Sequence, residues 1–338
     1  MSYTKLSLKL MLDDFIKRGV RPHGNLLTLS RYYINFDKEF FNRICRASGW
    51  SVEISEDIPF LNDEIIFHTL GFEHLESMDY SDYEWANIIH DLNDTNVSKN
   101  MIGKYDFIID AGTIEHVFNL RNVLENIYKM LKIGGTFFFH QPTFDGLNHG
   151  YYNFSPCLFH DYFKVNNYQI NAIVPHSIKD DFVYLADPQI NDICVKMPII
   201  EGSHNMVFGS VTKTKKTSFD VMPYQVNFPV LWDKSAKETI DETFKRAKNN
   251  SIYLYGTGNF CKCLLRMLPE KYRTKIAGLL SKDADEIGLL LYGHRIYSLD
   301  DIKEKNSTIL IATINKYQNI VYNRIKNLDK RYNVVRLD

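Results

Sequence analysis

Three ionisable side chains and a glycine stand together where an apolar segment of the sequence ends. The segment YDFIID (105–110) ends in Asp110, and Gly112, Glu115 and His116 follow within six residues. An acid favours a positive charge beside it, a histidine near its ordinary pKa accepts a proton, and a glycine lets a ligand approach the backbone closely. We therefore expect a binding site after this segment.

Further histidines lie near the ends of other predicted strands. His140 closes the apolar run of GTFFFHQP (135–142), and His149 stands in DGLNHGYYNFSP, a loop rich in aromatic residues. A hydroxyl must lose its proton when it attacks an electrophile, and histidine suits that task. The candidate catalytic bases are His149, His140 and His116. His116 has an alternative role in holding its turn together, and His160 has a structural role within a predicted helix.

Strands and helices alternate along the first two thirds of the chain. Short β-branched and aromatic runs predict strands, and apolar residues at helical spacing predict the helices between them. Acids and glycines gather after the strands, as in doubly wound sheets whose ligands bind at the carboxyl ends. We predict an α/β fold with a parallel sheet. The expected strands are 24–33, 74–81, 86–93, 105–110 and 135–142, and the expected helices are 37–48, 62–72 and 120–135.

The length of 338 residues favours two domains. A polar helix at 235–250 separates the first set of elements from a second strand, glycine turn and helix pattern that begins at SIYLYGTGNFCKCLL. The expected parts are an N-terminal helix (1–23), a first domain (24–214), a linker with a helix (215–250) and a small Rossmann-like domain (251–338).

Composition argues against several classes of protein. Forty basic and 41 acidic residues leave almost no net charge, so no nucleic-acid partner is expected. The sequence shows neither a signal peptide nor an apolar run long enough to span a membrane, so we expect a cytoplasmic location. Five cysteines without a CxxC pair fit neither a disulfide framework nor a zinc site, and no metal is expected.

The segment YDFIIDAGTIEHVFNLRNVLENIYKMLKIGGTFFFHQP (105–142) resembles the central pattern of class I S-adenosylmethionine-dependent methyltransferases. The resemblance covers about residues 24–214 and is strongest over 79–168. It implies S-adenosylmethionine as the cofactor. The chain departs from the family at LLTLSRYYINFD (26–37), where a glycine-rich turn is usual and no glycine is present.

The resemblance assigns roles to residues after the predicted strands. It places Asp79 at the ribose hydroxyls and Asp91 with Leu92 at the adenine. Taken alone, each of Asp79, Asp91 and Asp110 is more simply explained as a solvated turn acid or a helix cap, and it is their order within one pattern that favours the functional roles. The remaining implied residues are Asp110, Ala111 and Gly112 beneath the methionine moiety, and Glu115, Tyr151 and Tyr152 at the acceptor.

Two longer stretches, SMDYSDYEWANIIHDLND (77–94) and NHGYYNFSPCLFHDYFKVNNY (148–168), resemble a bacterial subset found in surface-sugar pathways such as capsule synthesis. The subset implies O-methylation of a sugar or sugar nucleotide, and aromatic side chains such as Tyr151 and Tyr152 suit stacking on sugar rings. The alternatives are methylation of nitrogen or carbon on such a sugar, and a methyltransferase fold that binds without catalysing.

The second domain resembles the small Rossmann-like domains attached to sugar-modifying enzymes. Gly256 and Gly258 lie on its strand-to-helix turn, where helix amides bind phosphate. The third glycine of the dinucleotide pattern is replaced by Cys261, and close packing explains two glycines equally well. The domain is expected to bind a nucleotide-sugar handle, or only to pack and form a homodimer.

Overall fold

The computed structural model describes residues 2–144, 146, 148–179, 182–185, 204–223, 234–247, 250–302, 304, 306–313, 315–328 and 332–337. The chain divides into two compact units, Met1–Gln225 and Val226–Asp338. Each unit is described by itself. Much of the expected linker, at 224–233 and 248–249, lies outside the described residues.

The first unit is built on one mixed sheet whose strand order is β5-β4-β2-β6-β7-β10-β8-β9 within the described residues. The first five of these strands run parallel, and β10, β8 and β9 add antiparallel pairs at one side. The predicted doubly wound α/β sheet is confirmed. The strands are β2 (Asn25–Leu29), β4 (His74–Asp79), β5 (Ile88–Ile89), β6 (Tyr105–Asp110), β7 (Leu131–Pro142), β8 (Gln169–Lys179), β9 (Phe182–Leu185) and β10 (His204–Thr212).

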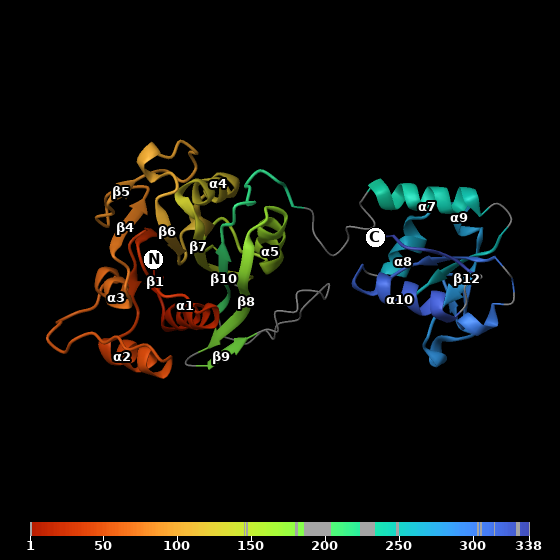
Figure 1. Ribbon diagram of the computed structural model, residues 1–338, viewed down its shortest axis with the longest axis horizontal. Coiled ribbons are helices and arrows are strands. Elements are labelled where there is room, and N and C mark those ends of the chain that lie inside the picture. The colour runs from red at the N-terminus through yellow and green to blue at the C-terminus, as the bar shows by residue number, and fades with distance from the viewer. Residues whose placement is uncertain are drawn as a thin grey trace. The chain divides into compact units, whose positions relative to one another are not determined.

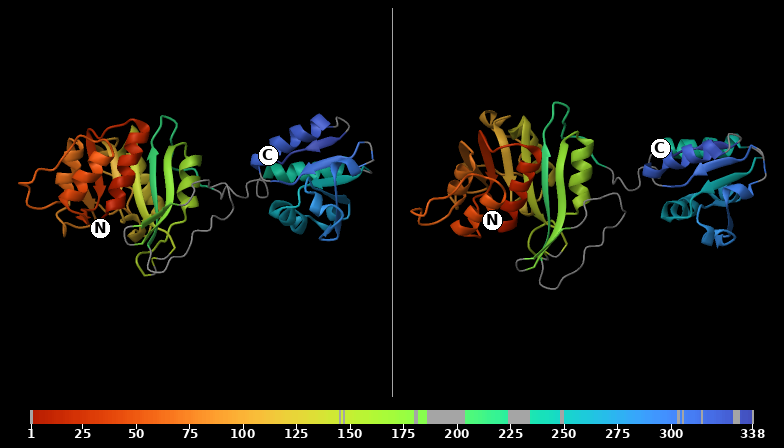
Figure 2. Two further views of the ribbon diagram at one scale, coloured as in Figure 1. Left: turned by 90° about the horizontal axis from the view of Figure 1, so that it is seen from below. Right: turned by 60° about the horizontal axis from the view of Figure 1, so that its bottom comes forward.

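Helices cover both faces of this sheet (Figures 1 and 2). One apolar cluster joins α1, α2 and α3 to one face, and a second joins α4 and α5 to the other. Side chains of a strand alternate between faces, so Phe137 and Phe139 of β7 enter one cluster while Phe138 enters the other. The helices are α1 (Lys5–Arg18), α2 (Lys38–Ala47), α3 (Asp63–Leu70), α4 (Leu120–Met130) and α5 (Pro156–Val165).

The helix starts follow their sequence signals, but one helix end does not. Asp37 caps α2 by accepting a hydrogen bond from the Phe40 amide at 2.7 Å, as its residue type predicts. Helix α4 was expected to continue to Gly134, and it ends at Met130. Leu131 instead pairs with Tyr105 in the sheet, and the Gly134 amide donates to the Lys213 carbonyl at 2.7 Å. Strand pairing on both sides thus replaces the last helical turn.

The second unit is a smaller α/β body with strand order β13-β14-β12-β11-β15-β16 in its described part. Helix α7 (Lys234–Arg246) was expected in the linker, but its Ala236, Ile240 and Phe244 are buried in the core of this unit. The other elements are β11 (Ile252–Tyr255), α8 (Asn259–Met267), α9 (Glu270–Arg273), β12 (Ile276–Leu280), β13 (Leu290–Leu291), β14 (His294–Tyr297), β15 (Thr308–Ile311), α10 (Asn315–Leu328) and β16 (Asn333–Val335).

None of the described helices combines the length and the apolar character that a membrane crossing requires.

Gly209 of β10 tests how tightly the first unit is packed. A Cβ at this position would lie 1.9 Å from Phe139 Cζ, and the Phe139 ring already packs against Phe159 at 4.2 Å between ring centroids. We expect Gly209→Ala to lower the free energy of unfolding by about 1–3 kcal/mol through overpacking. Urea unfolding followed by tryptophan fluorescence measures the change. Lys215→Ala is the control, because Lys215 is an exposed residue of the same unit, and equal stability of the two variants would contradict the packing.

Candidate functional site

A cavity of about 470 Å³ opens at the carboxyl ends of the parallel strands. The strand order reverses between β2 and β6, and ligands of doubly wound sheets bind outside the carboxyl ends at such a switch point. Five residues expected at the site line this cavity. They are Asp79, Asp91, Leu92, His116 and Tyr151.

Two carboxylates line the cavity, one at the end of β4 and one in the segment that follows β5. Asp79 ends β4, and its carbonyl accepts a hydrogen bond from the His90 amide at 2.9 Å, which ties β4 to the segment after β5. Asp91 is exposed, and its Oδ1 accepts from the Asn93 amide at 2.9 Å. The buried Leu92, which follows Asp91 in the sequence, also lines the cavity. The lining therefore offers two acceptors beside an apolar surface.

The turn after β2 is made without the usual glycines. Ser30 takes a left-handed conformation with φ of 77°, which costs a side-chain-bearing residue roughly 1–2 kcal/mol. Its amide donates to the Met78 carbonyl at 2.6 Å, and the Thr113 hydroxyl donates to the Leu29 carbonyl at 2.6 Å. These bonds join the ends of β2, β4 and β6. Ser30 therefore occupies a glycine-like backbone position and lines the cavity.

Asp110 lies in the protein interior next to this turn and is absent from the cavity lining. It is 1% exposed, and its carboxylate accepts from the Thr113 amide at 2.9 Å and from Gln141 Nε2 at 2.5 Å. Burial raises the pKa of Asp110 well above its ordinary value, and the nearby Glu115 raises it further. Ala111 is buried in the core, and Gly112 has a φ of 100°, which explains the glycine. These three residues shape the turn.

Glu115, His116 and His149 form one cluster at the edge of the cavity. Glu115 is 1% exposed, and its Oε1 lies 3.9 Å from His116 Nε2 and 3.6 Å from His149 Nε2. Burial raises the pKa of Glu115 to about 7. Burial also lowers the pKa of His116, and the neighbouring His149 adds to this effect. The structure thus brings together three of the residues expected from sequence at the reaction.

Backbone contacts fasten the loop that carries His149. The Tyr151 amide donates to the Glu115 carbonyl at 2.8 Å, and the Tyr152 amide donates to the same oxygen at 3.3 Å. A Cβ on Gly150 would lie 2.8 Å from that carbonyl, so only glycine permits this approach. The loop after β7 is therefore held against the turn after β6.

The two expected tyrosines have different surroundings. Tyr151 is 68% exposed and meets the Phe118 ring edge to face at 5.7 Å between centroids. Tyr152 is partly buried, stacks on Phe154 at 5.6 Å, and donates from its hydroxyl to the Phe118 carbonyl at 2.5 Å. Tyr151 offers a ring to a ligand, whereas Tyr152 supports the loop.

His140 does not reach the cavity, which corrects its assignment as a candidate base. It is 4% exposed, its Nδ1 lies 2.7 Å from Ser7 Oγ of α1, and its Nε2 lies 2.9 Å from His176 Nε2 of β8. Burial lowers the pKa of His140 well below its ordinary value, and His176 adds to the shift. The side chain points to the α1 face because it alternates with Phe139 along β7. His160 pairs with its neighbour Asp161 at 2.9 Å on α5.

Several residues that line the cavity were not predicted from the sequence. Tyr80 directly follows Asp79, and Phe118 follows the acid–histidine step, so their positions beside expected residues were the available signal. Ser30 carried no signal because its left-handed backbone is visible only in the structure. The residues missed are Ser30, Met78, Tyr80, His90, Asn93, Thr113, Val117 and Phe118.

The glycine turn of the second unit is packed closely. Gly256 has a φ of 124°, and a Cβ there would lie 2.7 Å from the Ala312 carbonyl oxygen. The Thr257 hydroxyl beside it donates to Glu286 Oε2 at 2.6 Å. Packing thus accounts for the glycine at position 256. The negative charge of Glu286 beside the turn disfavours binding of a phosphate there. Gly258 begins α8 as its N-cap.

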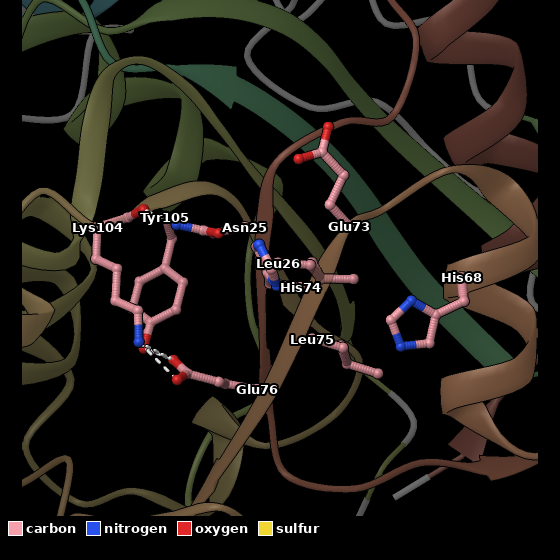
Figure 3. A pocket seen from close by; sticks show the side chains of 9 residues that line it. All are labelled: Asn25, Leu26, His68, Glu73, His74, Leu75, Glu76, Lys104 and Tyr105. Atoms are coloured by element: carbon pink, nitrogen blue, oxygen red, sulfur yellow. Dashed lines mark hydrogen bonds and ion pairs between the residues drawn. The ribbon is translucent and has the colours of Figure 1, made fainter.

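A second hollow of about 520 Å³ lies at the opposite edge of the first sheet (Figure 3). It is lined at the starts of β2, β4 and β6, where Lys104 Nζ lies 2.6 Å from Glu76 Oε1. These are the amino ends of the strands, away from the edge where doubly wound folds bind ligands. The candidate site is therefore the smaller cavity.

No model of a protein family matches the chain, and no curated protein sequence does. Among solved structures, TehB from Haemophilus influenzae has 12% identity and a TM-score of 0.32 over 60% of this chain and 62% of its own. The N-methyltransferase NodS from Bradyrhizobium japonicum, in complex with S-adenosyl-L-homocysteine, has 10% identity and a TM-score of 0.32 over 62% and 86%. The 1,6-didemethyltoxoflavin-N1-methyltransferase from Burkholderia thailandensis has 11% identity and a TM-score of 0.34 over 62% and 78%.

The buried pair His140–His176 gives a testable pH dependence of stability. The folded protein lowers the pKa of His140, so the unfolded chain binds more protons below the ordinary value of 6.5. The contribution of His140 to the unfolding free energy should therefore be complete above that pH. It should fall as the pH is lowered, by up to ~1.4 kcal/mol between pH 7.5 and 5.5. Urea unfolding at the two pH values measures the loss.

His140→Gln should reduce this loss, because glutamine does not titrate but keeps hydrogen-bonding groups for its neighbours. His204→Ala serves as the control, since His204 is exposed. A pH dependence in His140→Gln as steep as in the unsubstituted protein would show that His140 is not the group responsible.

Proposed function

We propose that the chain is an S-adenosylmethionine-dependent methyltransferase. The observation that carries this proposal is the cavity at the switch point, which is lined by Asp79 at the end of β4 and by Asp91 and Leu92 in the segment after β5. Its volume of about 470 Å³ falls within the roughly 300–1,000 Å³ of small-molecule sites. The order of these residues is that of the methyltransferase resemblance in the sequence.

The donor is held along the carboxyl ends of the parallel strands. Asp79 accepts hydrogen bonds from the ribose hydroxyls, and Asp91 accepts from the adenine amino group beside Leu92. The methionine end lies toward Ser30 and Thr113, close to the buried Asp110. A positively charged sulfonium or amino group nearby favours the ionised form of Asp110 and opposes the burial that raises its pKa.

The acceptor is a hydroxyl of a sugar or sugar nucleotide of bacterial surface polysaccharide synthesis. This identification rests on the sequence resemblance to the surface-sugar subset, and the exposed rings of Tyr151 and Phe118 support it because aromatic faces pack on sugar rings. Glu115, His116 and His149 lie beside the cavity, where the hydroxyl loses its proton as the methyl group arrives. A cytoplasmic location and a homodimer stay predictions.

Asp79→Ala tests the donor site. We expect the affinity of the full chain for S-adenosylhomocysteine to fall about 10- to 150-fold, because the ribose loses a charged acceptor worth roughly 1.5–3 kcal/mol. Isothermal titration calorimetry measures the affinity. Asp82→Ala is the matched control, since Asp82 is an exposed acid of the same loop and does not line the cavity.

Two results would contradict this proposal. Absence of S-adenosylhomocysteine binding by the unsubstituted chain would remove the methyltransferase function altogether. Equal affinity of Asp79→Ala and Asp82→Ala would place the donor elsewhere. Binding without methyl transfer to any sugar nucleotide would favour the non-catalytic alternative.

A further inference from the structure

We propose that Glu115, His116 and His149 bind a divalent transition-metal ion at the acceptor side of the cavity. Each residue offers one ligand atom, and the three atoms lie within 4.8 Å of one another. Two histidines and one carboxylate with further positions open are a donor set typical of catalytic metal sites. This proposal departs from the expectation of no metal, which rested on the cysteines.

The distances suit a shared ion after a small closing movement. Two ligand atoms at ~2.1 Å from one ion stand roughly 3–3.5 Å apart at octahedral or tetrahedral angles. Glu115 Oε1 lies 3.6 Å from His149 Nε2 and 3.9 Å from His116 Nε2. These separations are longer than hydrogen bonds and exceed those of a shared ion by only a few tenths of an ångström.

Glu115 supplies an independent indication of a ligand. The residue is 1% exposed, and its Oε2 has no hydrogen-bond partner among the described residues. An unsatisfied buried carboxylate oxygen costs about 1–3 kcal/mol or more, so such groups are rare without a function. A cation at Oε1, the oxygen nearer the histidines, compensates the charge of this carboxylate, and bidentate binding by Glu115 would include Oε2 as well.

The backbone holds the ligands in place before any ion binds. Glu115 and His116 belong to the 3-10 helix Ile114–His116, in which the His116 amide donates to the Thr113 carbonyl at 3.0 Å. His149 is carried by the loop whose Tyr151 amide bonds to the Glu115 carbonyl at 2.8 Å. The loop that carries His149 is therefore bonded to the backbone of Glu115 itself.

The cluster is accessible through its two histidines. The side chains of His116 and His149 are 36% and 58% exposed, while that of Glu115 is buried. His116 is also part of the cavity lining. An ion held here keeps coordination positions for water or for an oxygen of the acceptor, as catalytic sites with three protein ligands do.

The chemical role of this ion rests on the proposed function. An acceptor hydroxyl bound to the ion loses its proton to solvent more readily, because a divalent cation lowers the pKa of a coordinated oxygen. The resulting alkoxide forms a bond to the methyl carbon while the bond from that carbon to the sulfonium sulfur breaks. The products are a methyl ether and neutral S-adenosylhomocysteine. His149 then acts as a ligand, where the sequence predicted a base.

Titration of the full chain with Co²⁺ alone tests the site through its visible absorption bands. We expect one Co²⁺ ion per chain. Loss of outer partners of metal ligands weakens binding about 10- to 100-fold, so loss of a ligand in Glu115→Gln or His149→Ala should weaken it by at least about 100-fold. His160→Ala is the matched control, because His160 also contacts a carboxylate, that of Asp161, but belongs to no three-ligand group among the residues that the structure describes.

The outcomes separate this proposal from the donor site. No Co²⁺ binding, or equal binding by His149→Ala and the unsubstituted chain, would overturn the metal site. Circular dichroism and calorimetry with S-adenosylhomocysteine are measured on the same samples. A folded Glu115→Gln variant that keeps the donor product but loses Co²⁺ supports a distinct metal site. Binding of Co²⁺ without binding of S-adenosylhomocysteine would support the metal site and contradict the methyltransferase function.

Discussion

The parallel pairing of β2 with β6 determines where every candidate functional residue lies. Leu29 pairs with Asp110 at the last position of this ladder. The turn after β2 and the turn after β6 therefore begin at the same level of the sheet. The chain leaves these neighbouring strands toward different partners, β4 on one side and β7 on the other. A crevice opens where connections diverge in this way. Asp79, Ser30 and Thr113 meet around it because their strands end together.

This arrangement places acids where water is scarce. Asp110 and Glu115 are both buried after β6, and burial raises the pKa of each. Such a pair is costly unless positive charge or hydrogen bonds compensate. Asp110 is compensated by the Thr113 amide and the Gln141 side chain. Glu115 keeps an unsatisfied oxygen, and a cationic donor and a metal ion are the ligands whose charge suits these acids.

The sequence predicted the parts of the fold and site that depend on local pattern. Asp79 and Asp91 were expected beside the cavity and line it, because acids that follow strands reach the carboxyl edge of the sheet whatever the details of packing. Glu115 and His116 lie at the same edge because they follow the end of β6 closely. Their functional roles stay predictions. The helix α4 ended early because pairing of Leu131 with Tyr105, a contact distant in sequence, replaced its last turn.

Residues whose surroundings depend on distant segments were not predictable. His140 stands at a strand end like the others, but its ring faces α1 and meets His176, 36 positions away. The glycine-free turn at Ser30 depends on a left-handed backbone bonded to Met78 and packed near Thr113, which no local pattern announces. Helix α7 is polar on average, yet Phe244 buries its ring in the second unit. Long-range contacts decided each case.

Hydrogen–deuterium exchange with and without S-adenosylhomocysteine tests the central claim most directly, since it locates the bound nucleoside in the full chain. The account predicts slower exchange at residues 78–80, 90–93 and 113–118, whose backbone surrounds the cavity, with little change at residues 73–76 beside the other hollow. Slower exchange confined to residues 73–76 or to the second unit would contradict it.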